Sequence, residues 1–254
     1  MNYSVSNASL RILVTRPQHQ AHRLCGLLEA AGHECIRLPT IDILPVADVG
    51  SLAAHIDALQ QYDLAVFVSI NAVKSALKAI LDRRAWPAQT RIASVGARSA
   101  EALSEFGLSV DLLPEHQFNS EALLALAALQ DMRGRQVVIF RGNGGREHLR
   151  DTLLQRGATV DYVEVYRRAC PDVEATQLQH LWQPGYLDYI SISSNEALQN
   201  LLAMAGETAR PSLLQIPLLV IGERQVLLAK QLGFTCTPRV AAQASDEAIV
   251  AALA

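Results

Sequence analysis

The residues best suited to chemistry form a glycine-rich loop, RGNGGR at 141–146, directly after the apolar run Val137–Phe140. The backbone N–H groups at the start of a following helix are unpaired and lie at the positive end of the helix dipole, so such a loop can bind an anion. The spacing does not match GxGxxG, and no GxxxxGK[ST] motif is present, which disfavours a nucleotide site. A tight turn would explain the glycines but not the flanking Arg141 and Arg146.

Tyr166 is a candidate proton donor. It stands near the end of a predicted strand, Thr159–Tyr166, in which Val163 and Val165 alternate with Glu164 and Tyr166. A tyrosine in an extended segment is more often a packing residue. A phenol followed by two arginines can also donate a proton to a leaving group.

Hydroxyl and imidazole side chains give weaker signals. His19 and His22 have no third ligand at a recognisable spacing, so we expect no metal site. Ser69 and Ser194 follow predicted strands but lie in no GxSxG motif and have no evident histidine partner, which argues against nucleophilic catalysis. We expect them to bind a ligand or to cap the next helix, and capping is the preferred interpretation for either serine taken alone.

These residues belong to a strand–turn–helix–strand unit that recurs along the chain. In its second copy, the strand Val137–Phe140 and the helix Arg146–Arg156 precede a helix-ending glycine and the strand that holds Tyr166. In the first copy, the strand Arg11–Thr15 and the helix Gln18–Ala31 have the same order. The corresponding pairs, whose numbers differ by 125, are Arg16 and Arg141, Leu28 and Leu153, Gly32 and Gly157, and Ile41 and Tyr166. Two copies of alternating strand and helix predict an internally duplicated α/β protein with parallel sheets.

Small polar residues or glycines follow each predicted strand. Ligands of open parallel sheets bind beyond the carboxyl ends of the strands, so these turns together predict a broad anion-binding surface. The turns are Thr15-Arg16-Pro17, Ser69-Ile70-Asn71, Gly96-Ala97-Arg98, Arg141-Gly142-Asn143, Ser193-Ser194-Asn195 and Gly222-Glu223-Arg224.

Composition narrows the class of protein. The chain has 254 residues, of which 50% are hydrophobic and 19% charged, with a formal net charge of −3, so we expect two domains and no nucleic-acid partner. No run of 18 apolar residues and no export signal is evident, which predicts a soluble cytoplasmic protein that binds no membrane. The cysteines (Cys25, Cys35, Cys170 and Cys236) form no CxxC pair, and we expect buried reduced thiols.

Six segments occur in a recognisable order from about Arg11 to the C-terminus: RILVTRP, FVSINAV, SVGARSAEAL, RGNGGREHL, VYRR and SDEAIVAAL. In their order and in the overall length of the chain, they resemble the uroporphyrinogen-III synthase (HemD) family. The resemblance implies two flavodoxin-like lobes: residues 1–37 with 172–254, and residues 46–162. It also implies that residues 38–45 and 163–171 connect the lobes as a hinge made of a two-stranded β-ladder.

The same resemblance implies a cyclising hydro-lyase of tetrapyrrole and haem biosynthesis. Its substrate is the linear tetrapyrrole hydroxymethylbilane, which loses water and closes to uroporphyrinogen III with inversion of ring D in a cleft between the lobes. The resemblance implies no cofactor and no metal, and we expect a monomer. It assigns Tyr166 as the candidate catalytic acid, and substrate binding to Thr15, Arg16, Ser69, Ile70, Asn71, Gly96, Arg141, Gly142, Ser193 and Ser194.

One turn departs from the family pattern and keeps an alternative open. Many relatives carry small hydroxyl residues where this chain has Gly222-Glu223-Arg224-Gln225. The alternative is a non-catalytic, two-lobed protein that binds a tetrapyrrole or a small anion. A nucleotide-binding α/β protein is a weaker, third hypothesis.

Overall fold

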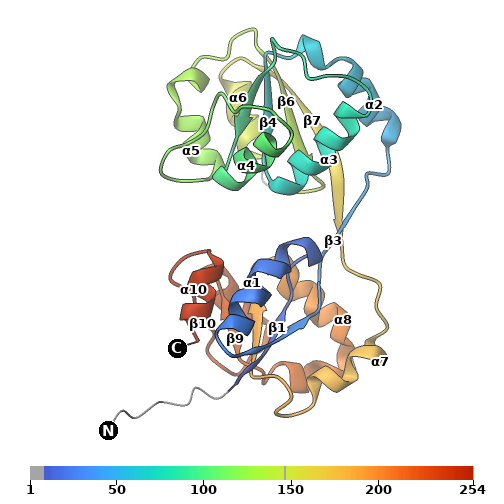
Figure 1. Ribbon diagram of the computed structural model, residues 1–254, viewed down its shortest axis with the longest axis vertical. Helices are drawn as coiled ribbons and strands as arrows, with labels where there is room; N and C mark the ends of the chain where they lie inside the picture. The colour runs from blue at the N-terminus through green and yellow to red at the C-terminus, as the bar shows by residue number, and fades with distance from the viewer. Residues whose placement is uncertain (1–8, 146, 254) are drawn as a thin grey trace. The chain divides into compact units, whose positions relative to one another are not determined.

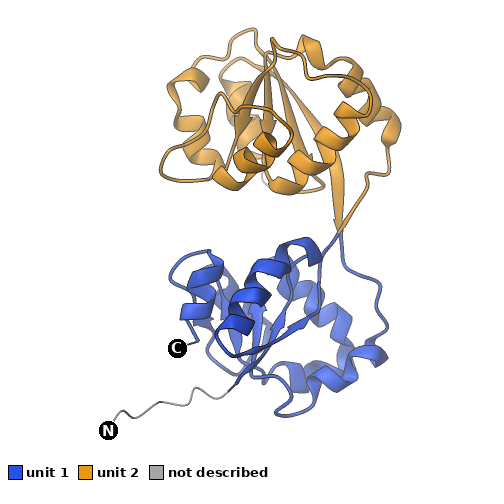
Figure 2. Ribbon diagram, viewed as in Figure 1, with its two compact units in different colours: residues 1–42, 169–254 blue, residues 43–168 orange. Residues whose placement is uncertain are grey.

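The computed structural model describes residues 9–145 and 147–253. The chain forms two compact units, shown in Figure 2. Unit 1 contains the residues up to Asp42 together with those from Ala169 onward, and unit 2 contains Ile43–Arg168. The chain therefore passes from one unit to the other twice, once inside each of the stretches expected to connect the lobes.

Unit 1 is built on a five-stranded parallel sheet with helices on both faces (Figure 1). The strand order is β10-β9-β8-β1-β2, with β1 at Arg11–Val14, β2 at Glu34–Arg37, β8 at Tyr189–Ile192, β9 at Leu218–Val220 and β10 at Arg239–Val240. The helices are α1 (Gln18–Ala30), α7 (Ala175–Leu178), η3 (Gln179–Trp182), α8 (Asn195–Leu213), α9 (Glu223–Leu232) and α10 (Asp246–Ala251). Ile12 and Val14 pack against α1 and α10, whereas Leu13 packs with α8 and α9, so β1 is apolar on both faces.

Unit 2 has a sheet of order β3-β7-β6-β4-β5, in which β4 to β7 pair in parallel. The strands are β3 (Asp42–Leu44), β4 (Leu64–Phe67), β5 (Arg91–Ser94), β6 (Gln136–Gly142) and β7 (Thr159–Ala169). The helices are α2 (Val49–Asp57), η1 (Leu59–Gln61), α3 (Ile70–Leu81), α4 (Ala97–Glu105), α5 (Ser120–Ala125), η2 (Ala127–Leu129) and α6 (His148–Gln155). One core joins the sheet to α2, α3 and α4, and a second joins it to α5 and α6. The predicted mixed α/β class with parallel sheets is confirmed.

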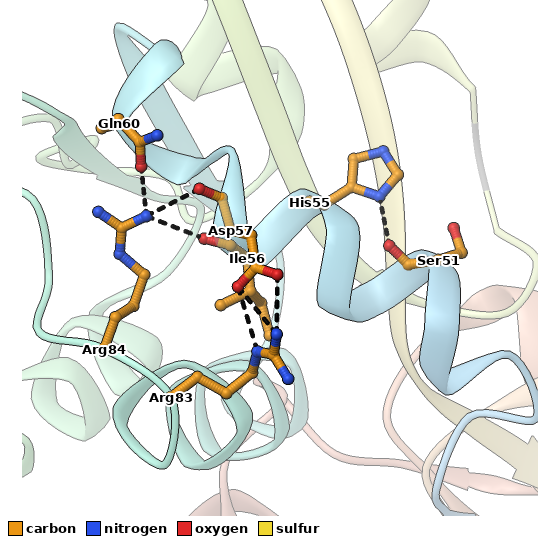
Figure 3. Close-up of polar contacts among 7 residues, drawn as sticks. All are labelled: Ser51, His55, Ile56, Asp57, Gln60, Arg83 and Arg84. Carbon is orange, nitrogen blue, oxygen red and sulfur yellow. Dashed lines mark hydrogen bonds and ion pairs between the residues drawn. The ribbon is translucent and has the colours of Figure 1, made fainter.

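Side chains cap helices at either end. The Ser69 and Ser194 hydroxyls accept the backbone N–H groups of Ala72 and Ala197, at 3.1 Å and 3.0 Å, which confirms the capping interpretation of both serines. At the carboxyl end of α2, the Arg84 guanidinium donates to the carbonyl oxygen of Asp57 at 3.0 Å and to that of Ile56 at 3.3 Å (Figure 3). The last carbonyl oxygens of a helix lack the regular hydrogen bond from the residue four positions on, and Arg84 closes the last turn of α2 by donating to two of them.

The cysteines differ from the expectation of buried reduced thiols. That expectation is wrong for Cys25 and Cys35, which form a disulfide with a Cα–Cα distance of 5.5 Å. Cys25 faces inward from α1 and Cys35 lies on β2, and α1 packs directly on β2, so the fold brings the two together. Cys170 and Cys236 are free thiols as expected, but Cys170 is exposed.

One helix boundary also changes. The helix expected at Arg146–Arg156 is α6 at His148–Gln155. Arg146 lies outside the described residues.

Candidate functional site

A pocket of about 280 Å³ opens at the carboxyl ends of β4 and β6 in unit 2. It is the position at which open parallel sheets bind ligands. Its lining includes Ser69, Arg141, Gly142 and Tyr166 from the predicted site residues. The other lining residues are Val68, Ser120, Ile139, Gly144, Gly145, Leu149, Tyr162 and Arg168.

A β-bulge in β7 sets the direction of Tyr166. Along the β6–β7 ladder, Arg141 pairs with Glu164 but Gly142 pairs with Tyr166, so Val165 is an extra residue on β7. A bulge breaks the alternation of a strand and re-aims the side chain that follows. Val165 and Tyr166 accordingly pack in the same hydrophobic core, although strict alternation predicts opposite faces of the sheet.

The Tyr166 ring lies directly against the backbone of Gly142. A Cβ atom added to Gly142 would stand 2.5 Å from the ring carbon Cζ and 2.9 Å from the hydroxyl oxygen. Both distances are far shorter than a van der Waals contact. Only glycine therefore permits this position of the ring.

Two side chains contact the Tyr166 hydroxyl. Arg168 donates from Nη2 to the phenolic oxygen at 3.1 Å, and the Ser69 hydroxyl lies 3.3 Å from the same oxygen. Arg168 was not among the predicted site residues. A signal for it was present, because residues two apart on a strand share a face, and Arg168 follows Tyr166 at that spacing.

The buried Arg141 holds the glycine loop together from inside. Its guanidinium donates to the carbonyl oxygen of Gly142 at 3.2 Å, to the carbonyl oxygen of Gly144, and to the Glu147 carboxylate at 3.1 Å. The guanidinium carbon also lies 4.3 Å from the centre of the Tyr162 ring. Burial raises the pKa of the Tyr162 phenol above its ordinary value, so this ring stays neutral beside the guanidinium.

The remaining predicted residues of unit 2 start helices. Ile70 and Asn71 form the first turn of α3, after the capping Ser69. Gly96 precedes α4, and it is not part of the pocket lining. These positions present helix N-termini at the carboxyl edge of the sheet.

The predicted residues of unit 1 follow β1 and β8. The Thr15 hydroxyl donates to the carbonyl oxygen of Ser191 at 2.7 Å, and the buried Arg16 forms an ion pair with Asp246. Ser193 is half-buried in the turn after β8, and Ser194 caps α8.

The divergent turn 222–225 leads into α9 of unit 1. Gly222 precedes α9, Glu223 and Arg224 are exposed, and Gln225 is buried with 8% exposure.

The described residues contain neither a membrane-spanning helix nor a metal cluster. None of the described helices is both long and apolar enough to cross a membrane. Among residues 9–145 and 147–253, no three His, Cys, Asp or Glu side chains gather where they could hold a metal ion.

Comparison with known proteins gives consistent results. The family model described as "Uroporphyrinogen-III synthase HemD" matches residues 22–251. The curated uroporphyrinogen-III synthase of Escherichia coli K12 is 33% identical over 246 residues, which cover 96% of this chain and 100% of that protein. The chain belongs to the uroporphyrinogen-III synthase family. The enzyme of the same name from Salmonella typhimurium LT2 is also 33% identical, over the same share of both chains.

Solved structures of uroporphyrinogen-III synthases share this fold. A crystal structure of a mutant of the Thermus thermophilus enzyme matches with a TM-score of 0.63 and 19% identity, covering 96% of each chain. The Helicobacter pylori 26695 enzyme matches with a TM-score of 0.64 and 14% identity, over 95% of this chain and 97% of that one. At such low identity these matches concern the fold alone.

Proposed function

We propose that the chain is a uroporphyrinogen-III synthase, a lyase that closes hydroxymethylbilane to uroporphyrinogen III with loss of water and inversion of ring D. The observation that carries this proposal is the match along the entire length of the Escherichia coli synthase. A match to part of that protein could reflect a single domain shared between proteins of different activity. The match at 33% identity covers 100% of the Escherichia coli protein, so it concerns the whole enzyme.

We assign Tyr166 as the acid that starts the reaction. The phenol donates its proton to the terminal hydroxyl of the substrate, the C–O bond breaks, and water leaves an azafulvenium cation. The substituted carbon of ring D attacks this cation to give a spiro intermediate, which fragments and recloses with ring D inverted. The final loss of a ring proton returns a proton to the phenolate, so Tyr166 is unchanged over one cycle.

The pocket around Tyr166 suits a carboxylate side chain of the substrate. It combines the Ser69 hydroxyl with the glycines at 144 and 145, whose backbone N–H groups a carboxylate can approach. We propose that the start of the neighbouring helices adds further contacts, through Ile70, Asn71 and Gly96.

In unit 1, we propose that the turns after β1 and β8 bind the substrate through Thr15, Arg16, Ser193 and Ser194. Because Arg16 is paired with Asp246, its part is to hold the turn rather than to neutralise a carboxylate. No residue in this proposal requires a cofactor or a metal.

The finer architecture is also a proposal. Counting from β1 in unit 1 and from β6 in unit 2, four strands of each sheet have the order 2-1-3-4. Unit 1 adds β10 beside the fourth of these strands, whereas unit 2 adds β3 at the opposite edge, beside β7. The order 2-1-3-4 is that of a flavodoxin-like sheet, and it supports two duplicated lobes that exchange segments. We further propose that residues 38–45 and 163–171 serve as the hinge, and that the protein is a cytoplasmic monomer.

Counting turnovers separates this function from a non-catalytic binding protein. Hydroxymethylbilane would be generated in situ by its upstream enzyme, and the number of uroporphyrinogen III molecules formed per protein molecule would be measured. Many equivalents per molecule support the synthase. A single bound equivalent, with the remaining substrate closing at the rate seen without protein, would support the binding protein.

A further inference from the structure

We infer that Arg168 is a positioning residue for the reaction: it fixes the hydroxyl of Tyr166 for proton transfer. This inference rests on the proposed function and concerns how the proposed acid is held in place. Three features of the pocket carry it.

The first feature is the direct contact. Tyr166 and Arg168 lie two apart on β7 beyond the bulge, so their side chains share one face of the strand. The Arg168 guanidinium carbon lies 5.7 Å from the centre of the Tyr166 ring, and Nη2 donates to the phenolic oxygen at 3.1 Å. The cation therefore covers the ring and binds its hydroxyl at the same time.

The second feature fixes the backbone of Arg168. The Asn143 carboxamide accepts the Arg168 N–H at 2.6 Å and donates to the Arg168 carbonyl oxygen at 3.4 Å. The Asn143 backbone N–H also donates to the carbonyl oxygen of Tyr166 at 3.2 Å. The hydrogen bonds from the Asn143 side chain thus continue the pairing of β6 with β7 past the end of β6, and they hold Arg168 beside Tyr166.

The third feature is the number of hydrogen bonds that the hydroxyl can make. A guanidinium has donors only, so its contact uses the phenolic oxygen as an acceptor and leaves the phenolic proton available. The Ser69 hydroxyl already accepts the N–H of Ala72, so it too is held in place. Arg168 therefore selects an orientation in which Tyr166 can give its proton to a ligand or to Ser69.

The contact between Arg168 and the Tyr166 hydroxyl also stabilises the negative charge that forms on Tyr166 during the reaction. When the phenol gives its proton to the leaving hydroxyl of the substrate, water departs and a phenolate remains beside the Arg168 cation. The ring proton released at the end of the reaction restores the phenol. Arg168 gains and loses no proton, and it stabilises the intermediate charge with a charge-assisted hydrogen bond.

The test is a double-mutant cycle between Arg168 and Tyr166. Arg168→Met keeps the bulk of the side chain and removes its donors and charge, and we expect kcat to fall about 10- to 100-fold, as for loss of a hydrogen bond to a charged group, with little change in KM. Arg168→Lys keeps the positive charge and N–H donors but not the planar guanidinium, and we expect it to recover part of the loss. The matched control is Arg167→Met, which removes an arginine from the exposed position next to it and does not line this pocket.

In a Tyr166→Phe protein there is no hydroxyl left to orient. We expect Arg168→Met to have no further effect there, so the double variant has the kcat of Tyr166→Phe alone. As a second probe, Asn143→Ala should lower kcat in the wild-type background and leave kcat of the Tyr166→Phe protein unchanged.

Specific results would overturn the inference. The inference would be overturned if the losses of kcat in Arg168→Met and Tyr166→Phe multiplied in the double variant, or if Arg168→Met raised KM and left kcat unchanged. Either result would mean that Arg168 binds the substrate directly. An Arg168→Met enzyme with the kcat of the wild type would also overturn it, while leaving the proposed synthase activity intact. If the wild-type protein itself produced no enzymatic macrocycle, the proposed function would fall first, and this inference with it.

Discussion

Replacing Gly142 with alanine tests the packing that places Tyr166. The added methyl group would stand 2.5 Å from the ring carbon Cζ and 2.6 Å from Cε2. Carbon atoms in contact are about 3.5 Å apart, so either the ring or the loop must move by about 1 Å. The ring has 1% exposure, and the surrounding side chains leave it little space to move.

We expect Gly142→Ala to affect both stability and activity. Overpacking of this kind costs about 1–3 kcal/mol of the free energy of unfolding, measured by chemical denaturation. A displacement of about 1 Å at a catalytic group lowers the rate by about 100-fold, measured as kcat for uroporphyrinogen III. The control is Gly50→Ala in the exposed first turn of α2, where the new methyl group makes an ordinary contact at 3.5 Å and should leave kcat unchanged.

A second background separates the two effects of Gly142→Ala. The closest contacts involve ring carbons, so Gly142→Ala should destabilise a Tyr166→Phe protein about as much as it destabilises the wild type. Its effect on kcat should disappear in that background, because the hydroxyl that it displaces is absent. A Gly142→Ala protein with the stability and kcat of the wild type would refute the packing argument, and an undiminished loss of kcat in the Tyr166→Phe background would refute the link to the hydroxyl.

Three further predictions concern unit 2 and are read from chemical denaturation. Burial, and after it a hydrogen bond to the Asp161 carboxylate, raises the pKa of Tyr62 far above its ordinary 10.0, so its contribution to stability is complete below pH 10.0 and is lost as the pH rises further. Tyr62→Phe should therefore make the free energy of unfolding fall less steeply with pH above 10.0, and an unchanged slope would contradict this prediction. The hydrogen bond from the backbone N–H of Gln136 lowers the pKa of Asp63 below 3.8, so the contribution of Asp63 to stability is present above pH 3.8 and is lost as the pH falls. Asp63→Asn should therefore make the free energy of unfolding fall less steeply as the pH is lowered below 3.8, and an equally steep fall would argue against this role. Arg84→Met should lower the free energy of unfolding by about 1–2 kcal/mol, because it removes the cap from the end of α2. The control Arg83→Met removes an exposed ion pair with Asp57 (Figure 3) and should cost less than about 1 kcal/mol. Equal losses in the two variants would rule out the cap.

The architecture follows from the sequence because its signals are local. The apolar run at Val137–Phe140 lies within β6, and the helix predicted at Gln18–Ala31 is α1 at Gln18–Ala30. Buried parallel strands read as continuous apolar runs, and glycines mark the helix ends, so neither signal depends on distant contacts. The disulfide between Cys25 and Cys35 depends on how α1 packs on β2, and no spacing rule for CxxC pairs predicts it.

The interior of the site could be predicted only in part. The glycine loop and the phenol have sequence signals, and Gly142 and Tyr166 line the same pocket. The bulge at Val165 has none, because one extra residue in a strand leaves its apolar pattern almost unchanged. Without the bulge, strict alternation assigns Tyr166 to the face opposite Val165, and the contact between Arg168 and the hydroxyl cannot be foreseen.

The most direct test of the central claim is the isomer composition of the product. Hydroxymethylbilane would be generated in situ, the protein added, the product oxidised and the uroporphyrin isomers separated. The account predicts that isomer III predominates, since only an enzyme-directed closure inverts ring D. Isomer I alone, formed at the rate seen without protein, would contradict it.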